Sequence, residues 1–231
     1  MIPLKNLNPR RTFPVMTLFL IAANVAVFIH QITLPPKAFD AFINTYGVIP
    51  SHIQMALAGR RYTLMDALYP LFTCMFVHGG FLHIIGNMWF LWIFGDNVED
   101  EFGAVPYLFF YLFCGIVSGI TQVAFSWGSH IPSVGASGAI SGVLAAYVIL
   151  FPRAKVLTLV PLLFFWFTAR ISAWVFIGIW FLLQFLSGLG SLGAINTGGV
   201  AWWAHVGGFA MGALITLGVK VSRGSPSRSF A

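Results

Sequence analysis

The chain has 231 residues, of which 58% are hydrophobic and only 8% are charged. Soluble domains carry about 25% charged residues, so this composition excludes an ordinary soluble domain, and the 24 Phe and 8 Trp residues exclude a disordered chain. The composition predicts a polytopic membrane protein, because six spans of about 20 residues each fit within this length.

Six apolar segments along the chain are predicted to cross the membrane as helices. Residues 1–14 before them are expected to form a basic cytoplasmic tail, and residues 221–231 a second one. The sequence therefore predicts an all-α membrane protein in which residues 15–220 form a bundle of six transmembrane helices. The predicted spans cover residues 15–34, 81–94, 105–127, 135–151, 171–189 and 200–219.

Two apolar segments lie outside these spans. Residues 35–80 form a large loop after the first span, and its apolar side chains predict short helices lying at the membrane surface. Residues 156–168 are apolar but contain Pro161, and they are too few for a span, which needs about 20 residues. We expect this segment to lie at the interface or to pack against the bundle.

The basic residues indicate the orientation, because Lys and Arg are enriched in cytoplasmic loops. With the N-terminus inside, six spans leave more bases on the inner side than on the outer side, so both termini are expected to be cytoplasmic and the loop over 35–80 to be outside. The basic character then reflects topology, and the expected partner is the lipid bilayer rather than nucleic acid. The inner bases are Lys5, Arg10, Arg11, Arg153, Lys155, Arg170, Lys220, Arg223 and Arg228, and the outer ones are Lys37, Arg60 and Arg61.

Polar residues recur on three of the predicted helices. His83 and Asn87 are four residues apart, so they share one face of the second helix. The last helix carries a stripe of small residues that includes His205, and the fourth helix offers a matching face that begins at Ser137. Small residues let helices approach closely, which explains the glycines as packing devices but does not explain the histidine. The two stripes are Ala201, His205, Gly208 and Gly212, and Ser137, Ser141 and Ala145 beside Gly138 and Gly142.

In the predicted topology Ser137, His205, His83 and Asn87 all lie in the outer half of the membrane. Serine becomes a nucleophile when a base takes its proton, and histidine is the usual base. Acidic residues are absent after Glu101, which favours a Ser–His dyad, although Asp40 and Asp66 in the outer loop stay open as partners.

Other catalytic designs lack their residue types. An HExxH motif is absent and the spans hold no pair of aspartates, so neither a zinc protease nor an aspartyl mechanism is expected. No metal and no cofactor are expected. Cys74 and Cys114 are interpreted as structural residues.

Three motifs in order resemble the rhomboid family of intramembrane serine proteases. They are Gly-Ala-Ser-Gly at 135–138 opening a helix, His-x-x-x-Asn at 83–87 on an earlier helix, and Ala-His-x-Gly-Gly-x-x-x-Gly at 204–212 on the last helix. The acidic segment 95–103 is similar as well. The resemblance covers about residues 15–220.

By this resemblance Ser137 is the nucleophile, His205 is the base, and His83 and Asn87 stabilise the oxyanion. Further positions implied as structural are Gly135, Gly138, Gly208 and Glu99. The sequence departs from the family in two places. Tyr69-Pro70 replaces a Trp-Arg pair in the first loop, and Ser141 replaces an aromatic residue that stacks on the histidine, which is then expected to be held in another way.

The resemblance implies an intramembrane serine endopeptidase that cleaves peptide bonds in or near transmembrane segments of other membrane proteins. The expected location is a bacterial inner membrane, with the active site open to the outer side. Two alternatives are a catalytically inactive member that binds transmembrane segments and a small transporter. The oligomeric state does not follow from the sequence.

Overall fold

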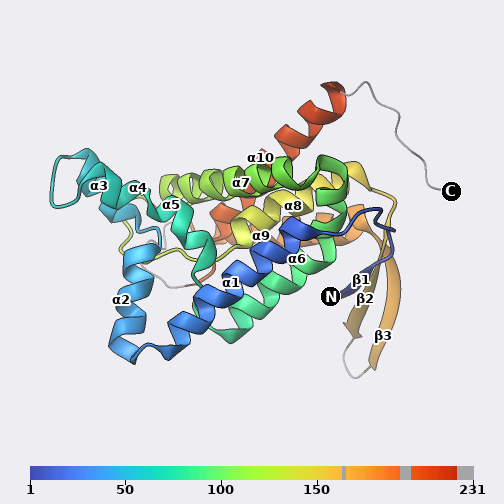
Figure 1. Ribbon diagram of the computed structural model, residues 1–231, viewed down its shortest axis with the longest axis horizontal. Coiled ribbons are helices and arrows are strands. Elements are labelled where there is room, and N and C mark those ends of the chain that lie inside the picture. The colour runs from blue at the N-terminus through green and yellow to red at the C-terminus, as the bar shows by residue number, and fades with distance from the viewer. Residues whose placement is uncertain (163–164, 193–198, 223–231) are drawn as a thin grey trace.

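A bundle of helices forms the body of the protein in the computed structural model, which describes residues 1–162, 165–192 and 199–222. Figure 1 shows these helices between a group of short helices at one end and a small sheet at the other. The helices of the body are α1 (Val15–Thr33), α6 (Phe81–Phe102), α7 (Ala104–Phe125), α8 (Ser137–Leu150), α9 (Ala173–Gly190) and α10 (Trp202–Ser222).

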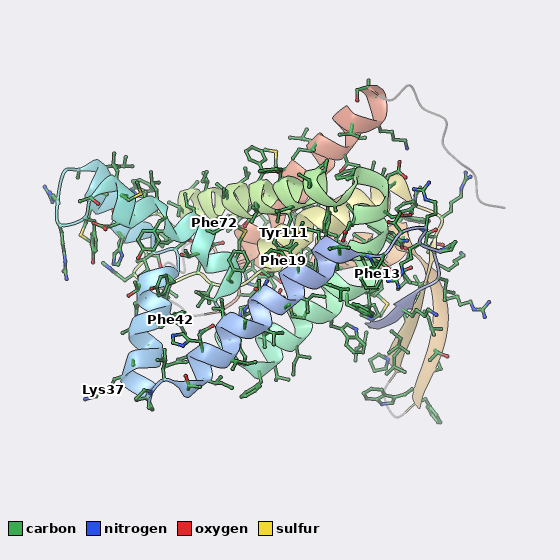
Figure 2. All side chains as sticks on the ribbon, in the orientation of Figure 1. Phe13, Phe19, Lys37, Phe42, Phe72 and Tyr111 are labelled. Atoms are coloured by element: carbon green, nitrogen blue, oxygen red, sulfur yellow. The ribbon has the colours of Figure 1, made fainter. Side chains whose placement is uncertain are left out.

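Most of these helices are long and apolar enough to cross a bilayer. Among the described residues α1, α7, α9 and α10 qualify alone, and α6 qualifies together with the short helices of 64–76, from which it is bent by 75°. Apolar side chains such as Phe19 and Phe72 cover the outer surface, whereas Tyr111 is fully buried (Figure 2). The protein is thus a multi-pass helical membrane protein, while the count of six spans and the cytoplasmic termini stay predictions.

Helix α8 is the short central helix of the bundle. Its 14 residues span about 21 Å at 1.5 Å per residue, which is less than the roughly 30 Å of a bilayer core. Helices α6, α7, α9 and α10 all pack against it, and the residues from Gly138 to Tyr147 are buried. Because protein surrounds α8, its length need not match the bilayer.

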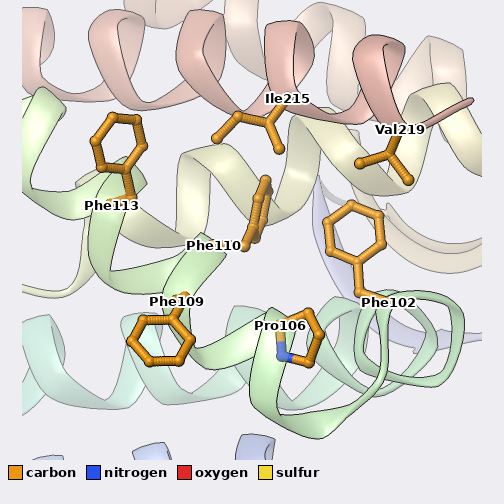
Figure 3. A pocket seen from close by; sticks show the side chains of 7 residues that line it. All are labelled: Phe102, Pro106, Phe109, Phe110, Phe113, Ile215 and Val219. Carbon is orange, nitrogen blue, oxygen red and sulfur yellow. The ribbon is translucent and has the colours of Figure 1, made fainter. Parts of the chain in front are cut away.

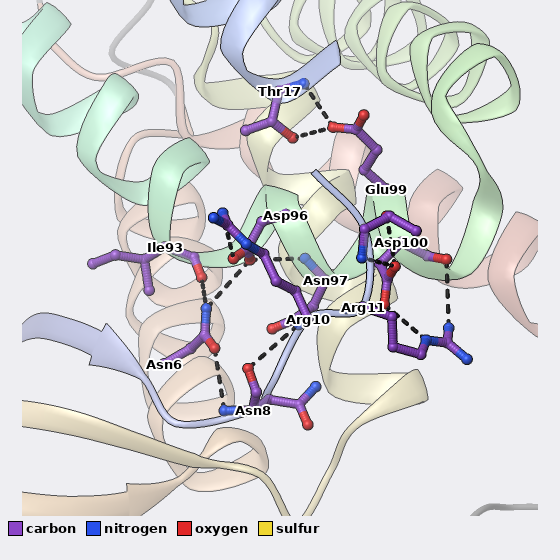
Figure 4. Close-up of polar contacts among 11 residues, drawn as sticks. Asn6, Asn8, Arg10, Arg11, Thr17, Ile93, Asp96, Asn97, Glu99 and Asp100 are labelled. Carbon is purple, nitrogen blue, oxygen red and sulfur yellow. Dashed lines mark hydrogen bonds and ion pairs between the residues drawn. The ribbon is translucent and has the colours of Figure 1, made fainter. Parts of the chain in front are cut away.

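The acidic segment 95–103, expected to lie beyond the end of the second span, continues the helix as far as Phe102, so α6 does not end near Phe94. The buried Glu99 accepts hydrogen bonds from the Met16 amide at 2.8 Å and from the Thr17 amide and hydroxyl, both at 2.7 Å. Figure 4 shows the two bonds from Thr17. These donors belong to the first turn of α1, which lacks internal acceptors. The acid therefore caps α1 and ties it to α6.

Short helices make up the loop after α1, as predicted. Only α2 lacks a buried residue among them. Thr63 and Asp66 form a reciprocal capping box at the start of one helix, which satisfies two backbone N–H groups. The elements are α2 (Pro36–Tyr46), α3 (Pro50–Leu57), α4 (Leu64–Leu68), α5 (Pro70–Thr73) and the 3-10 turn η1 (Cys74–Phe76).

A three-stranded antiparallel sheet corrects the all-α prediction. Its strands are β1 (Ile2–Asn6), β2 (Lys155–Leu162) and β3 (Phe165–Ser172), in the order β1-β2-β3. The apolar segment 156–168 is thus part of a β-hairpin, because it is too short to span as a helix and rich in β-branched and aromatic residues. Pro161 lies beyond Leu159, the last residue of β2 that pairs with β1. The sheet tolerates proline there because, among the described residues, β2 has no neighbour on that side that needs its N–H group.

The first fourteen residues, predicted as a tail, therefore contain a strand. The Trp89 indole N–H donates to the Pro3 carbonyl at 2.6 Å, and the Asn6 amide donates to the Ile93 carbonyl, so β1 is fixed along α6. Arg11 bonds to Asp100 at 3.0 Å, and this contact raises the pKa of its guanidinium. Of the second predicted tail, residues 223–231 lie outside the described residues.

Candidate active site

Ser137 and His205 lie in hydrogen-bond contact, although 68 positions separate them in the chain. Ser137 is the first residue of α8, and His205 lies in the first turn of α10. The distance from the His205 Nε2 to the Ser137 Oγ is 2.8 Å, and the histidine is buried. This contact is the geometry that a nucleophile and its base require.

Glycines bring the two helices together. A Cβ atom at Gly208 would overlap the carbonyl oxygen of Gly138, and a Cβ at Gly212 would overlap that of Gly142. The backbones of α8 and α10 therefore touch at two levels about one turn apart, as in other close helix pairs with small residues. Any side chain at these positions would separate the helices and with them Ser137 and His205.

Helix α7 packs as closely against the same glycines of α8. A Cβ at Gly138 would overlap the Ser118 hydroxyl, and one at Gly142 would lie 2.6 Å from the Cys114 sulfur. Because both α7 and α10 lie in contact with Gly138 and Gly142, the start of α8 has little freedom to move. This fixes the place of the Ser137 side chain.

His83 and Asn87 lie beside the loop that leads into α8. A Cβ atom at Gly135 would lie 2.6 Å from the His83 Nε2 and 3.6 Å from the Asn87 Nδ2. Gly135 also has a φ of +118°, and its N–H donates to the Cys74 carbonyl at 2.8 Å. Glycine is needed here for both the backbone conformation and the space.

The hydrogen bonds of these two side chains indicate which atoms face the site. The Gly79 N–H donates to the His83 Nδ1 at 3.4 Å, which leaves the proton of the neutral ring on Nε2, the atom nearest to Gly135. The Asn87 amide donates to the His83 carbonyl at 3.0 Å and has a second hydrogen to give. Two side-chain donors thus lie next to the loop of Ser137.

Gln184 is a site residue that sequence reasoning missed. Its Oε1 lies 2.7 Å from the Nδ1 of His205 and comes from α9, a third helix. Both ring nitrogens of His205 are therefore occupied, by Gln184 and Ser137, and neither is left for Asp40 or Asp66. The available signal was that Gln184 is an amide side chain in a span without charged residues, which is a reason to suspect function.

Ser141 takes the place of the expected aromatic residue, and the histidine is held by other side chains. The Ser141 hydroxyl donates to the Ser137 carbonyl at 2.6 Å, so it supports the first turn of α8. His205 instead lies near two indole rings, with centroids 5.9 Å away for Trp180 and 6.3 Å for Trp202. Together with the hydrogen bond to the Gln184 Oε1, these rings fix the imidazole.

Two cavities differ sharply in character. One of about 20 Å³ lies at Ser137 and is also lined by Ser118, Ser133 and Gly138, which is room for about one water molecule. The other, of about 320 Å³, lies between α7 and α10 and is lined by apolar side chains such as Phe110 (Figure 3). Of these two cavities, the small one touches the polar site and the large one does not. Across the described ranges, no three His, Cys, Asp or Glu side chains are placed to hold a metal ion.

The fold and this residue group define a multi-pass helical membrane protein with a serine–histidine pair whose histidine is buried. The model of the rhomboid domain family matches residues 65–221, which is more than half of the chain. The chain therefore belongs to the rhomboid family.

Several curated relatives are similar to the chain. RHOMBOID-like protein 4 of Arabidopsis thaliana is 28% identical over 225 residues, covering 89% of this chain and 52% of the relative. Rhomboid protein 1, mitochondrial, of Saccharomyces cerevisiae is 32% identical over 146 residues, covering 60% and 38%. Presenilin-associated rhomboid-like protein, mitochondrial, of Homo sapiens is 33% identical over 102 residues, covering 43% and 27%.

This chain thus spans about half, or less, of the length of the relatives it matches. These relatives come from a plant or are named as mitochondrial, so the expectation of a bacterial inner membrane is not supported. What the family and the helices support is a multi-pass membrane protein.

Proposed function

We propose that the protein is an intramembrane serine endopeptidase that hydrolyses peptide bonds in or near transmembrane segments of other membrane proteins. The observation that carries this proposal is the 2.8 Å contact between the Ser137 Oγ and the His205 Nε2. Family membership and the apolar helices around the contact agree with the proposal.

In the proposed mechanism the Ser137 hydroxyl attacks the carbonyl carbon of the scissile bond while its proton moves to the His205 Nε2. The tetrahedral intermediate collapses when His205 gives this proton to the leaving amine, which leaves an acyl group on Ser137. A water molecule then attacks the acyl group, with His205 again as base, and the released acid regenerates the hydroxyl.

The oxyanion of this mechanism needs donors that are already in place. The His83 Nε2–H and the free hydrogen of the Asn87 amide lie beside Gly135, two residues before the nucleophile. The first N–H groups of α8 have no internal acceptor and add a third source. We assign the stabilisation of the oxyanion to these groups.

A transmembrane substrate imposes one further condition. Every backbone group of a membrane-spanning helix is paired, so the helix must unwind before its carbonyl reaches Ser137. Substrates with Gly or Pro near the scissile bond are therefore expected to be cleaved best. The small cavity at Ser137 gives a water molecule a place next to the nucleophile.

The test is to incubate the purified chain in liposomes with a fluorescent transmembrane substrate and, separately, with a fluorophosphonate that labels active serines. Cleavage and labelling are expected for the wild type and are expected to be lost in Ser137→Ala. Ser222→Ala, at the far end of α10, is the matched control and should behave like the wild type. Labelling that persists in Ser137→Ala overturns the proposal.

A further inference from the structure

We infer that Gln184 is a positioning residue that fixes the protonation pattern of His205, the task that a carboxylate performs in a catalytic triad. This inference rests on the proposed function, in which His205 takes the proton of Ser137. It names the group that completes the site and the helix that supplies it.

The hydrogen-bond geometry gives the reason. A neutral imidazole carries one proton, so one nitrogen donates and the other accepts. The amide oxygen of Gln184 only accepts, and it lies 2.7 Å from Nδ1. The proton is therefore on Nδ1, and the lone pair of Nε2 points to the Ser137 hydroxyl 2.8 Å away. With the opposite tautomer, Nε2 would donate to Ser137 and could not receive its proton.

An amide suits this place better than a carboxylate because of the surroundings. Helix α9 contains no Asp, Glu, Lys or Arg, and it is one of the helices apolar enough to span a membrane. A charge at such depth is expensive, while a neutral amide provides the same acceptor without it. The difference is that an amide orients the imidazole but does not stabilise its positive charge as an anion would.

The contact also makes the site depend on three helices. Ser137 comes from α8, His205 from α10 and Gln184 from α9. Only Ala173, Phe176, Ile177 and Gly188 of α9 are buried, so this helix is held less firmly than α8. Because of the bond to Gln184, a shift of α9 would change the orientation of the catalytic imidazole.

The experiment compares Gln184→Leu, which keeps the size of the side chain but removes the acceptor, with Gln184→Glu, which keeps the acceptor. Leu183→Ala is the matched control, because Leu183 is an exposed neighbour on the same helix. Cleavage of the transmembrane substrate is measured across pH for each variant. In parallel, the ¹⁵N spectrum of histidine-labelled protein reports the tautomer of His205, with its signals identified from His205→Ala.

The wild type should show a proton on Nδ1 of His205. Gln184→Leu should show a mixture of tautomers and a kcat lowered about 10²-fold, with KM unchanged, since a misplaced catalytic group typically costs about this factor. Gln184→Glu should recover most of the rate and move the acid limb of the pH profile upward, because an anion favours the imidazolium.

The outcomes separate the two proposals. If the wild type neither cleaves the substrate nor reacts with the fluorophosphonate, the proposed function fails, and the spectrum still decides whether Gln184 sets the tautomer. If the wild type is active and Gln184→Leu keeps both its kcat and its tautomer, the inference about Gln184 is overturned. Equal losses in Gln184→Leu and Gln184→Glu with an unchanged tautomer would show a structural role only and would overturn it as well.

Discussion

The junction of α8 with α10 and the sheet β1–β3 are held together in opposite ways. At the junction, backbone meets backbone at Gly138 and Gly208, where even one added carbon atom overlaps a carbonyl oxygen. In the sheet, hydrogen bonds between strands provide the order, and the hairpin end is open, with Phe165 and Trp166 exposed to 75% and 64%.

The difference indicates two separate tasks: the junction positions the reacting atoms, and the sheet attaches the N-terminal segment to the helices. The junction places two reacting atoms 2.8 Å apart, so small displacements there should affect the chemistry. The sheet fixes the N-terminal segment along α6 and leads into α9, but it contributes none of the residues that surround Ser137. Activity should therefore respond strongly to changes at the junction and weakly to changes in the sheet.

His205→Ala should have the largest effect, because it removes the only side chain among the described residues that bonds to the Ser137 hydroxyl. Turnover should fall by about 10⁴-fold or more, as in other serine hydrolases that lose their base. Asp40→Asn and Asp66→Asn should each keep most of the activity, because both nitrogens of His205 have other partners. A thousandfold loss in either Asp variant, with the fold intact, would reveal a hidden triad.

Gly208→Ala should have the second-largest effect, because it places a methyl group directly in the junction of α8 with α10. Overpacking usually costs about 1–3 kcal/mol, and here the obstacle is backbone, so we expect the upper end of that range together with loss of labelling at Ser137. Gly218→Ala on the same helix is the control, because a Cβ there meets open space. Thermal unfolding in detergent compares the two; equal melting temperatures would show that the junction is less tight than described.

Asn87→Ala should lower kcat by about 10²–10³-fold with little change in KM, because an oxyanion donor acts mainly in the transition state. His83 and the backbone N–H groups of α8 share the task, which moves the single variant toward the smaller loss. The double variant His83→Ala/Asn87→Ala should then lose more than either single one. A raised KM at unchanged kcat would instead identify Asn87 as a substrate contact.

The sequence predicts the helices and the polar stripes because these are local patterns. The spacing of Ser137, Gly138 and Gly142, or of His205, Gly208 and Gly212, is visible within three turns of one helix. Gln184 has no such pattern, since its contact with His205 crosses between helices. Spacing alone brings a lone polar residue to notice but does not identify its partner.

The pairing of β1 with β2 was missed for a related reason. Ile2 pairs with Leu159, which is far away in the sequence. Nothing in either segment identifies the other as its partner strand. The end of α6 was misplaced because the apolar pattern of the sequence ends at the first charged residues. The helix continues past them, since Glu99 accepts hydrogen bonds from the first turn of α1. Both cases involve polar or backbone groups whose partners are distant in sequence.

Asn6→Ala should show the smallest effect and tests the sheet side of the comparison. The variant removes a buried amide that donates to the Ile93 carbonyl, a loss worth about 1 kcal/mol. For a chain of this size, such a loss lowers the melting temperature by about 2–4 °C. Trp166→Ala, at the exposed end of the hairpin, is the matched control and should leave the temperature unchanged.

Activity is the decisive measurement on these two variants. Because the sheet lies away from Ser137 and His205, both variants should cleave the transmembrane substrate within about twofold of the wild type, a difference of less than about 0.5 kcal/mol in barrier height. A tenfold loss of kcat in Asn6→Ala, with a melting temperature only a few degrees lower, would contradict this separation. It would mean that β1 reaches the site through α6, whose side chains His83 and Asn87 lie on the same helix as the contacts to Pro3 and Asn6.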